Sequence, residues 1–296
     1  MTRRGWVLFG LMAVIWGLPY LMIKVAVAEV PAPVLVFART AIGAAVLLPL
    51  CLRSAPISLL RGHWRPLLAF AATEVLGPWL LLADAEKRLP SSTTGLLIAA
   101  VPIIGALLAP LTGDRERIGP RRWTGLLIGF GGVALLAGPH LSGGDAWAIA
   151  EVLLCALGYA IAPIIVARRL TEFPGIPLTA LSLAVSAVVY SPVAILTWPA
   201  SPPGGQALAA VLGLALICTA TAFVLFFALI REAGPSRAMV FTYFNPVVAV
   251  AAGALVLAEP VTGSTAAAFA LVLCGSLLAT GRAADRAVTA EPSARP

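Results

Sequence analysis

The sequence has few charged residues and none of the clustered side chains that enzymes use. Only 11% of its 296 residues are charged, and neither an HExxH nor a GxSxG motif occurs. A membrane hydrolase would need grouped nucleophiles, acids or metal ligands. The two histidines, His63 and His140, fall on opposite sides of the membrane in the topology derived below. The sequence therefore predicts no enzyme, no catalytic residue, no metal and no cofactor.

Cysteine is scarce as well. The four cysteines form no CxxC pair and fall in or at the edge of apolar runs; they are Cys51, Cys155, Cys218 and Cys274. Disulfide bonds are therefore not expected.

Apolar sequence is what the chain has in abundance. Hydrophobic residues make up 60% of the chain and its mean hydropathy is +0.98, far above the range of soluble globular proteins. The net charge of +7 would suit nucleic acid only if it formed a basic face on a soluble domain, whereas these arginines stand between apolar runs. The composition indicates an all-α integral membrane protein whose partner is the lipid bilayer, not nucleic acid.

Ten apolar runs approach the ~20 residues needed to cross a ~30 Å hydrocarbon layer. The connections between them are too short for a soluble domain, and the tail, 282–296, is expected to be disordered and cytoplasmic. The expected spans are 5–26, 32–51, 65–83, 91–112, 121–138, 146–167, 177–197, 206–230, 236–258 and 264–281.

The first run could instead be a signal peptide. Arg3 and Arg4 precede an apolar core, and AVA at 26–28 resembles a cleavage site. Because Lys24 interrupts the approach to that site and the run is long, a first membrane helix is favoured.

Basic residues are divided unequally between the two sides of the membrane. With a cytoplasmic N-terminus, 16 of the 20 Lys and Arg residues fall inside, whereas Lys24, Lys87 and Arg88 fall outside and Arg39 lies within a span. Since basic residues are retained on the cytoplasmic side, both termini are expected there.

Two of the runs carry a proline near the middle. Pro102 and Pro246 each remove a backbone donor and free the carbonyl four residues earlier, that of Ile98 or Thr242. Broken helices at matching places in two halves are typical of a transporter site at the interface between repeats.

The chain shows signs of an internal duplication. Pro102 and Pro246 lie 144 residues apart, and Glu116 and Glu259 lie 143 apart. The offset of 143 also pairs Trp16 with Tyr159, Gly17 with Ala160, Arg39 with Ser182 and Gly132 with Gly275. Because each half has an odd number of spans, five, the halves must enter the membrane upside down relative to each other. We expect two inverted five-helix repeats, 1–138 and 146–281, around a central cavity.

This ordered set of residues resembles the EamA-type drug/metabolite transporter family. The matching features are Trp16-Gly17 and Lys24 in IWGLPYLMIK, Arg39 in VFARTAIGA, Pro102, Glu116 in DRERIG, Gly125 and Gly132, and then Pro246, Glu259 and Gly275. The resemblance implies a ten-helix carrier of small metabolites in the bacterial inner membrane, often an exporter, with amino-acid exporters as a prominent branch. It also implies that helices one, three, four, six, eight and nine line the cavity, and Trp79 on the third helix joins the candidates. Ser182, Tyr159 and the acids of LLADAEKR depart from the family pattern.

Three charged residues lie at membrane depth. At 1.5 Å per residue, Arg39, Glu151 and Glu74 sit ~10, ~8 and ~15 Å below the outer surface. Such groups usually face a cavity or one another. One interpretation is a zwitterion site in which Arg39 or Lys24 holds a carboxylate and Glu74 or Glu151 an ammonium group. The alternative is a structural ion pair between helices.

Aromatic residues supply further candidates. Trp16, Tyr20 and Lys24 recur every four residues on one face of the first helix, which suits cavity lining or interfacial anchoring. Tyr159 shares a face with Glu151 on the sixth helix and suits substrate contact or core packing equally.

The ninth helix places Thr242 and Asn245 on one face, with Tyr243 and Pro246 beside them. The kink there either lines the substrate path, together with Pro102 in the fourth helix, or is purely structural.

Several functional alternatives stay open at this point. The small-molecule substrate is either an amino acid or a cationic compound of the multidrug type, and a passive facilitator would show the same spans. Acids that could carry a proton leave proton coupling open. The glycines of the fifth helix fit close helix packing, within a monomer or at a dimer contact.

The topology is directly testable. A periplasm-dependent reporter such as alkaline phosphatase, fused to the C-terminus, should be inactive, whereas a green fluorescent protein fused there should fluoresce. An active phosphatase fusion at that position would contradict the expected orientation.

Overall fold

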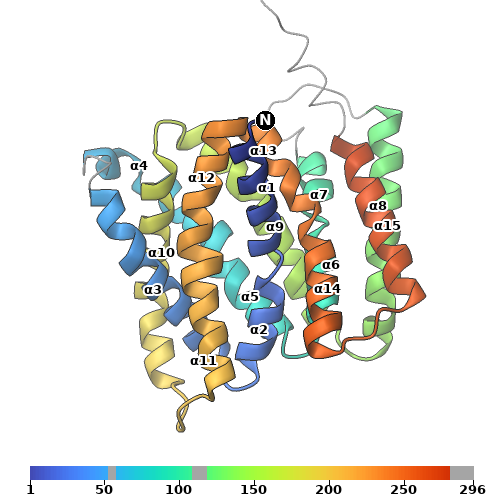
Figure 1. Cartoon of the computed structure of the whole chain (residues 1–296), viewed down its shortest axis with the longest axis horizontal. Helices are drawn as coiled ribbons and strands as arrows, with labels where there is room; N and C mark the ends of the chain where they lie inside the picture. Colours follow the sequence, from blue (N-terminus) through green and yellow to red (C-terminus); the bar gives the residue numbers. More distant parts are fainter. Residues whose placement is uncertain (53–57, 109–118, 281–296) are drawn as a thin grey trace, which may run out of the picture.

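The computed structural model describes residues 1–52, 58–108 and 119–280, and within these ranges all regular structure is helical. The helices run side by side as one bundle, with the start of α1 and the end of α15 at the same end (Figure 1). We call the opposite end of the bundle the distal end. The first half contains α1 (Arg3–Ile15), α2 (Pro19–Val27), α3 (Ala32–Leu52), α4 (Ser58–Ala71), η1 (Ala72–Leu76), α5 (Gly77–Ala85), α6 (Ser91–Ile98), α7 (Val101–Leu108) and α8 (Pro120–Ser142). The second half contains α9 (Ala146–Arg169), α10 (Gly175–Leu196), α11 (Gly205–Leu212), η3 (Gly213–Thr221), α12 (Ala222–Ala233), α13 (Pro235–Ala238), η4 (Met239–Tyr243), α14 (Asn245–Leu257) and α15 (Gly263–Thr280).

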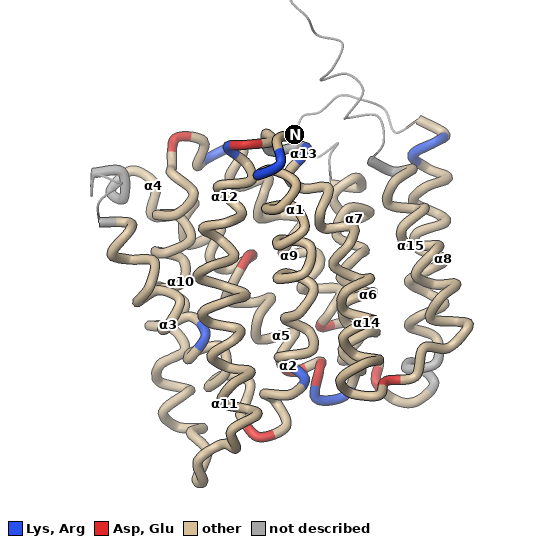
Figure 2. Tube along the Cα trace, viewed as in Figure 1, with Lys and Arg blue, Asp and Glu red and all other residues tan. Residues whose placement is uncertain are grey.

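Eight helical segments of the described chain are long and apolar enough to cross a membrane. They are Arg3–Val27, Ala32–Cys51, Gly62–Ala85, Ser91–Leu108, Ala146–Arg169, Gly175–Leu196, Gly205–Ala233 and Met239–Leu257. The other two expected spans, 121–138 and 264–281, correspond to α8 and α15, and α15 contains the shorter apolar helix Gly263–Leu278. The predicted all-α membrane architecture is confirmed. Charged residues gather mainly at the two ends of the bundle, and few lie between them (Figure 2).

Both expected helix breaks occur at the prolines. α6 ends at Ile98 and α7 begins at Val101, so that Pro102 is its second residue. α14 begins at Asn245, and Pro246 follows. A proline is tolerated in the first turn of a helix because its missing N–H would have no intrahelical acceptor there. Each proline therefore lies in the first turn of the second helix of its span.

Three further interruptions were not predicted. The first span breaks at Gly17, between α1 and α2, and the third and eighth spans contain the π-helical segments η1 and η3. Adding the offset of 143 to 72–76 gives 215–219, which lies inside η3. Pro78 helps to explain η1, because it cannot donate to the carbonyl of Glu74. π-Helical turns often lie at functional sites.

The two halves complete each other's packing. α3 packs along α10, α6 against α14, and α8 against α15, so corresponding spans meet in pairs. α5 packs on α9, and the corresponding elements of the other half, α12 and α1, are also in contact. The α8 and α15 backbones approach closely, since a Cβ on Gly275 would lie 2.5 Å from the Cα of Gly129. The glycine-rich fifth span thus packs within one chain.

Two glutamates at the distal end hold helix N-termini across the halves. Glu259 accepts the backbone N–H groups of Ser91 at 2.7 Å and Ser92 at 2.9 Å, at the start of α6. Glu29 accepts the N–H of Gly204, immediately before α11. A carboxylate at this position satisfies donors that have no intrahelical acceptor and complements the helix dipole. Burial would raise the pKa of Glu259, but hydrogen bonds from Ser92 and Ser91 lower it below its usual value.

The turn that carries Glu259 can be tested by two opposite substitutions. Ala258 has a left-handed φ of 54°, so Ala258→Gly should stabilise the fold by roughly 0.5–1 kcal/mol, the strain relieved minus the entropy cost of glycine. Gly253→Ala should destabilise it, because the new Cβ would lie 2.5 Å from Glu259 Oε2 and 2.9 Å from Ser91 Oγ.

The measurement is the apparent melting temperature in detergent. It is determined from the loss of the monodisperse chromatographic peak after heating. A lower melting temperature for Ala258→Gly would contradict the strain at this turn. Equal values for Gly253→Ala and wild type would contradict the close packing around Glu259.

Candidate functional site

A buried arginine lies at the meeting point of three spans. Arg39 of α3 is 7% exposed, its Nε donates to Thr219 Oγ1 of η3 at 2.9 Å, and its Cζ lies 3.6 Å from the centre of the Trp79 ring of α5. Thr219 in turn donates its hydroxyl to the Leu214 carbonyl at 2.8 Å, which fixes its oxygen as an acceptor for Arg39. Among the described residues, no carboxylate lies within ion-pair distance of Arg39.

Two tyrosines complete the surroundings of Arg39. Tyr20 of α2 and Tyr159 of α9 both interact electrostatically with the guanidinium. Tyr159 also lies beside Cys155, one turn earlier on α9. We call Tyr20, Arg39, Trp79, Tyr159 and Thr219 the central cluster. It brings together four of the residues singled out from the sequence, and Thr219 is an addition that no sequence pattern indicated.

Glu74 lies beside the central cluster, in η1. It interacts electrostatically with Tyr159 and Cys155, and its carboxylate has neither a hydrogen bond nor an ion pair within the described part of the chain. Contacts with two other helices hold η1 in position. Tyr190 of α10 donates its hydroxyl to the Leu76 carbonyl at 2.6 Å, and η1 packs tightly against α9.

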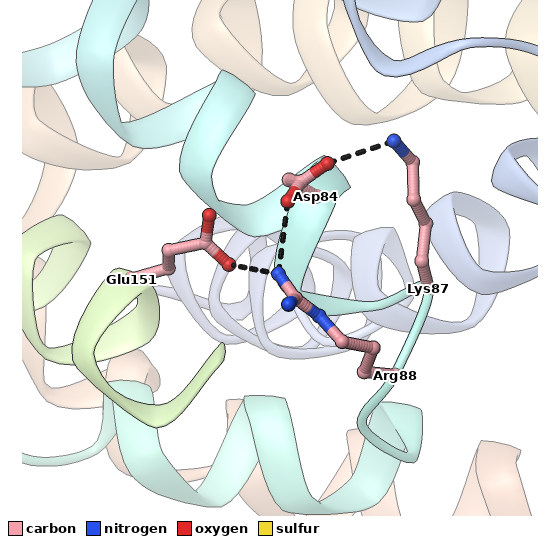
Figure 3. Close-up of polar contacts among 4 residues, drawn as sticks. All are labelled: Asp84, Lys87, Arg88 and Glu151. Carbon is pink, nitrogen blue, oxygen red and sulfur yellow. Dashed lines mark hydrogen bonds and ion pairs between the residues drawn. The ribbon is translucent and has the colours of Figure 1, made fainter. Parts of the chain in front are cut away.

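Glu151 belongs to a different group of charges. Asp84, Lys87, Arg88 and Glu151 form one network (Figure 3). Lys87 Nζ lies 2.7 Å from Asp84, and Arg88 lies 3.0 Å from Asp84 and 3.1 Å from Glu151. This network ties the segment after α5 to α9. For Glu151 the geometry therefore favours the structural ion pair over substrate binding.

Lys24 closes the end of α5. Its Nζ donates to the backbone carbonyls of Glu86 at 2.6 Å and Leu89 at 2.9 Å. The last carbonyls of a helix lack intrahelical donors, and a lysine often supplies them. The position of Lys24 is thus explained by the backbone, in addition to the cavity and anchoring roles considered from the sequence.

Glu86 was missed as a candidate. Glu86 is fully buried, and neither of its carboxylate oxygens has a hydrogen-bond partner in the described ranges. Burial raises the pKa of Glu86 well above its usual value, while Lys24 opposes the rise. The acids of LLADAEKR were a signal, but spacing alone could not separate Asp84, which is paired, from Glu86.

Trp16 packs inside an aromatic group rather than at a lipid interface. Its ring centre lies 5.5 Å from that of Phe223, 4.9 Å from Phe226 and 5.4 Å from Phe241. The next residue, Gly17, lies against the ninth span, where a Cβ would come within 2.4 Å of Val248 Cβ. The break in the first span therefore packs against the break in the ninth.

The other ninth-span candidates lie around that contact. A Cβ on Gly17 would lie 3.0 Å from the Asn245 carbonyl, and Asn245 Oδ1 is buried with no hydrogen-bond partner in the described chain. Thr242 donates to the Met239 carbonyl at 2.7 Å, within its own helix. Pro246 is buried, whereas Tyr243 and, in the fourth span, Pro102 are half-buried.

A pocket opens at the distal end, beside Lys24. Its volume is about 430 Å³, and its lining consists of Lys24, Val25, Ala28, Glu29, Gln206, Leu257 and Glu259. It lies between the first span and the eighth and ninth. Across the described residues, no group of His, Cys, Asp and Glu side chains could hold a metal ion.

These features together define a class of protein. A bundle of apolar helices whose halves pack in corresponding pairs, with several helices interrupted around a buried cation, is the architecture of a multi-pass membrane carrier. The model of the EamA-like transporter family matches residues 3–138 and 146–281. The chain therefore belongs to the EamA-like transporter family, and the resemblance noted from the sequence is confirmed. The protein is a membrane transporter.

Curated relatives agree with this class. The chain is 28% identical over 251 residues to the "Uncharacterized inner membrane transporter YedA" of Escherichia coli (strain K12), covering 81% of this chain and 78% of the relative. It is 26% identical over 277 residues to an "Uncharacterized transporter" of Archaeoglobus fulgidus, covering 92% and 97%. A solved crystal structure has a TM-score of 0.67 at 23% identity, over 95% of this chain and 98% of that chain, which shows the fold. Glu116 and the tail, 282–296, lie outside the described residues.

The position of Glu74 generates a prediction for transport. Because its carboxylate has no ion-pair partner in the described ranges and lies beside Tyr159, Glu74→Gln should lower the transport rate at least about tenfold, the equivalent of ~1.4 kcal/mol, while the yield of folded protein stays the same. The rate is measured by counterflow in proteoliposomes, with Glu172→Gln as a control at a site remote from the central cluster. Unchanged counterflow in Glu74→Gln would remove Glu74 from the transport path.

Proposed function

We propose that this transporter exports small zwitterionic metabolites, with amino acids as the first candidates, by alternating access between two inverted repeats. The observation that carries the proposal is Arg39. It is a buried cation without a carboxylate partner in the described chain, at a meeting point of helices from both halves.

A charge within the membrane is costly unless it is paired or faces a polar cavity. Trp79 and Thr219 hold the guanidinium through its face and its Nε. These two contacts fix the plane of the guanidinium and leave its terminal N–H groups for another acceptor. Two parallel N–H donors match a carboxylate in a bidentate geometry. A substrate carboxylate would therefore supply the missing counter-charge.

The other end of a zwitterion needs an acceptor nearby. Glu74 has no ion-pair partner among the residues that the structure describes, and it interacts with Tyr159, which itself interacts with Arg39. An ammonium group between Glu74 and the ring of Tyr159 would gain an ion pair and a cation–π contact. Amino acids share an α-carboxylate and an α-ammonium group, so this site would bind the part that they have in common. The substrate's side chain would contact the neighbouring helices.

Movement between states would use the interrupted helices. The breaks at Gly17 and Phe244 pack against each other, and the fourth span breaks at Ala99 and Ala100. Such joints can bend with little loss of hydrogen bonding because the bonds are already absent. With both termini in the cytoplasm of a bacterial cell, opposite bending of the two repeats would expose the site first to the cytoplasm and then to the outside.

One rival function has an observation in its favour. An exporter of cationic compounds would use Glu74 and the aromatic side chains and would not need Arg39. A passive facilitator would share the cavity but show no coupling to an ion gradient. The proposed amino-acid exporter would depend on Arg39 and an exporter of cationic compounds would not. Arg39 is therefore the decisive position for mutation.

The test compares amino acids with a hydrophobic cation, tetraphenylphosphonium, in proteoliposomes. Arg39→Gln should lower amino-acid counterflow at least about tenfold, and Arg39→Lys should restore only part of it because lysine lacks the planar fork. Arg65→Gln, at an exposed arginine, is the matched control and should transport like wild type. Amino-acid counterflow that survives Arg39→Gln, or transport of the cation alone, would refute the proposal.

A further inference from the structure

A second buried charge site lies between the central cluster and the distal pocket. Glu86 follows α5 directly, is fully buried and has no hydrogen-bond partner for either carboxylate oxygen among the described residues. An ionised carboxylate in that state would forgo several kcal/mol of solvation without compensation. The arrangement is instead that of a neutral carboxylic acid.

Lys24 lies against the same turn but does not bind this carboxyl group. Its Nζ donates to the backbone carbonyls of Glu86 and Leu89, and no ion pair between Lys24 and a carboxylate occurs in the described ranges. An ammonium 2.6 Å from the Glu86 carbonyl is within reach of the Glu86 carboxyl after a change of rotamer. Its present choice of two neutral carbonyls is consistent with a protonated Glu86.

Groups from three other elements face Glu86. Tyr20 and Lys24 come from α2, Arg39 from α3, and Glu259 from the turn after α14. The charges nearest to Glu86 in sequence, Asp84, Lys87 and Arg88, form the separate network with Glu151 of α9. Lys24 and Glu259, which both interact electrostatically with Glu86, also line the distal pocket.

We propose that Glu86 is a proton-binding site of the transporter, and that loss of its proton draws Lys24 from the two backbone carbonyls to the Glu86 carboxylate. The carboxylic O–H bond breaks, the proton passes to solvent in the distal pocket, and the electron pair stays on the carboxylate. Lys24 keeps its charge and exchanges two neutral acceptors for an anion. This movement releases the turn between α5 and α6 and changes the lining of the pocket.

The site gives the carrier a response to pH that is separate from substrate binding at Arg39. Glu259 stays bound to the start of α6 and takes no part in the exchange, because its two oxygens are already occupied by Ser91 and Ser92. Arg39 interacts electrostatically with Glu86, so the central cluster senses whether the proton is bound. For its transport consequences the inference rests on the proposed function.

The direct test needs no substrate. Infrared difference spectra of the purified full-length protein are recorded during a pH titration, and the C=O stretch of protonated carboxylic acids is followed. Among the bands of protonated carboxylic acids, wild type should show one component that disappears as the pH rises and that Glu86→Gln lacks at every pH. Glu74→Gln should retain it. A band of equal intensity in Glu86→Gln and wild type would overturn the assignment.

A second variant tests the role of Lys24. Removing a nearby cation stabilises the neutral acid, so Lys24→Met should move the midpoint of the Glu86 band upward by about one to three pH units. An unchanged midpoint would overturn the proposed exchange of Lys24. This titration also tests the site if Glu86→Gln yields no folded protein.

The pH dependence of the protein's stability tests the protonation of Glu86 independently, because the direction of the change is defined. Because the pKa of Glu86 is raised in the fold, the native state holds a proton that the unfolded chain has lost, and stability falls as the pH rises above ~4.3 towards the folded pKa. Glu86→Gln should remove this loss, so its advantage in melting temperature over wild type should grow with pH. A constant difference would contradict a neutral Glu86.

Transport is then measured at equal internal and external pH. The counterflow rate of wild type should change across the range in which the infrared band disappears, and Glu86→Gln should be independent of pH there. The same profile in both proteins would overturn the link to transport. A failure of amino-acid transport altogether would refute the proposed function, whereas the infrared result would still decide whether Glu86 binds a proton.

Discussion

The constraint on which this structure depends is that no backbone donor or acceptor can be left to hydrocarbon. A continuous helix satisfies its own backbone, but the spans of this protein are interrupted, and every interruption frees polar groups. Tyr190 supplies a donor for the Leu76 carbonyl in η1, and Ser276 donates to the Ala99 carbonyl at 3.3 Å, beside the break in the fourth span. Lys24 does the same for the turn after α5. At these three places a side chain from a neighbouring helix completes the interrupted backbone.

Most of these supporting bonds cross between the two halves of the chain. Tyr190 and Ser276 belong to the second half and serve the first, Glu259 of the second half holds the start of α6, and Glu29 of the first half holds the start of α11. A half on its own would leave these groups unsatisfied. The duplication thus yields one folding unit in which the two halves are bound together at interrupted helices and helix ends.

The sequence predicted the parts of this arrangement that depend on local covalent structure. Pro102 and Pro246 lack a donor, so the breaks beside them followed from residue type alone. η3 has no proline to announce it, and the π-helical turn there depends on packing and on the bond from Thr219 to the Leu214 carbonyl. Packing against other helices leaves no period in the sequence.

The candidate site was predictable to a similar depth. The position of Arg39 in an apolar run indicated that it lies buried within a span. Its aromatic neighbour Trp79 was also among the candidate site residues. The partner of Glu151 was not evident, because Arg88 lies 63 residues away and reaches it only through the fold. Glu86 stood next to Lys87 in the sequence, where a solvated ion pair was the ordinary expectation, yet the chain turns it inward.

The two halves share a backbone design but differ in their chemistry. At the offset of 143 residues, Arg39 corresponds to Ser182, Glu74 to Ile217, Trp79 to Ala222 and Glu86 to Leu229. Ser182 is fully buried and donates to the Leu178 carbonyl within its own helix, and Leu229 is fully buried in the apolar core. The second half thus keeps the matching π-helical turn and proline break but carries apolar or self-satisfied side chains at these four positions. In the proposed mechanism, symmetry would supply the hinges, which must work in both directions, whereas a substrate with a carboxylate at one end and an ammonium at the other would require an asymmetric set of charges. Divergence of the two halves at these four positions meets both requirements at once.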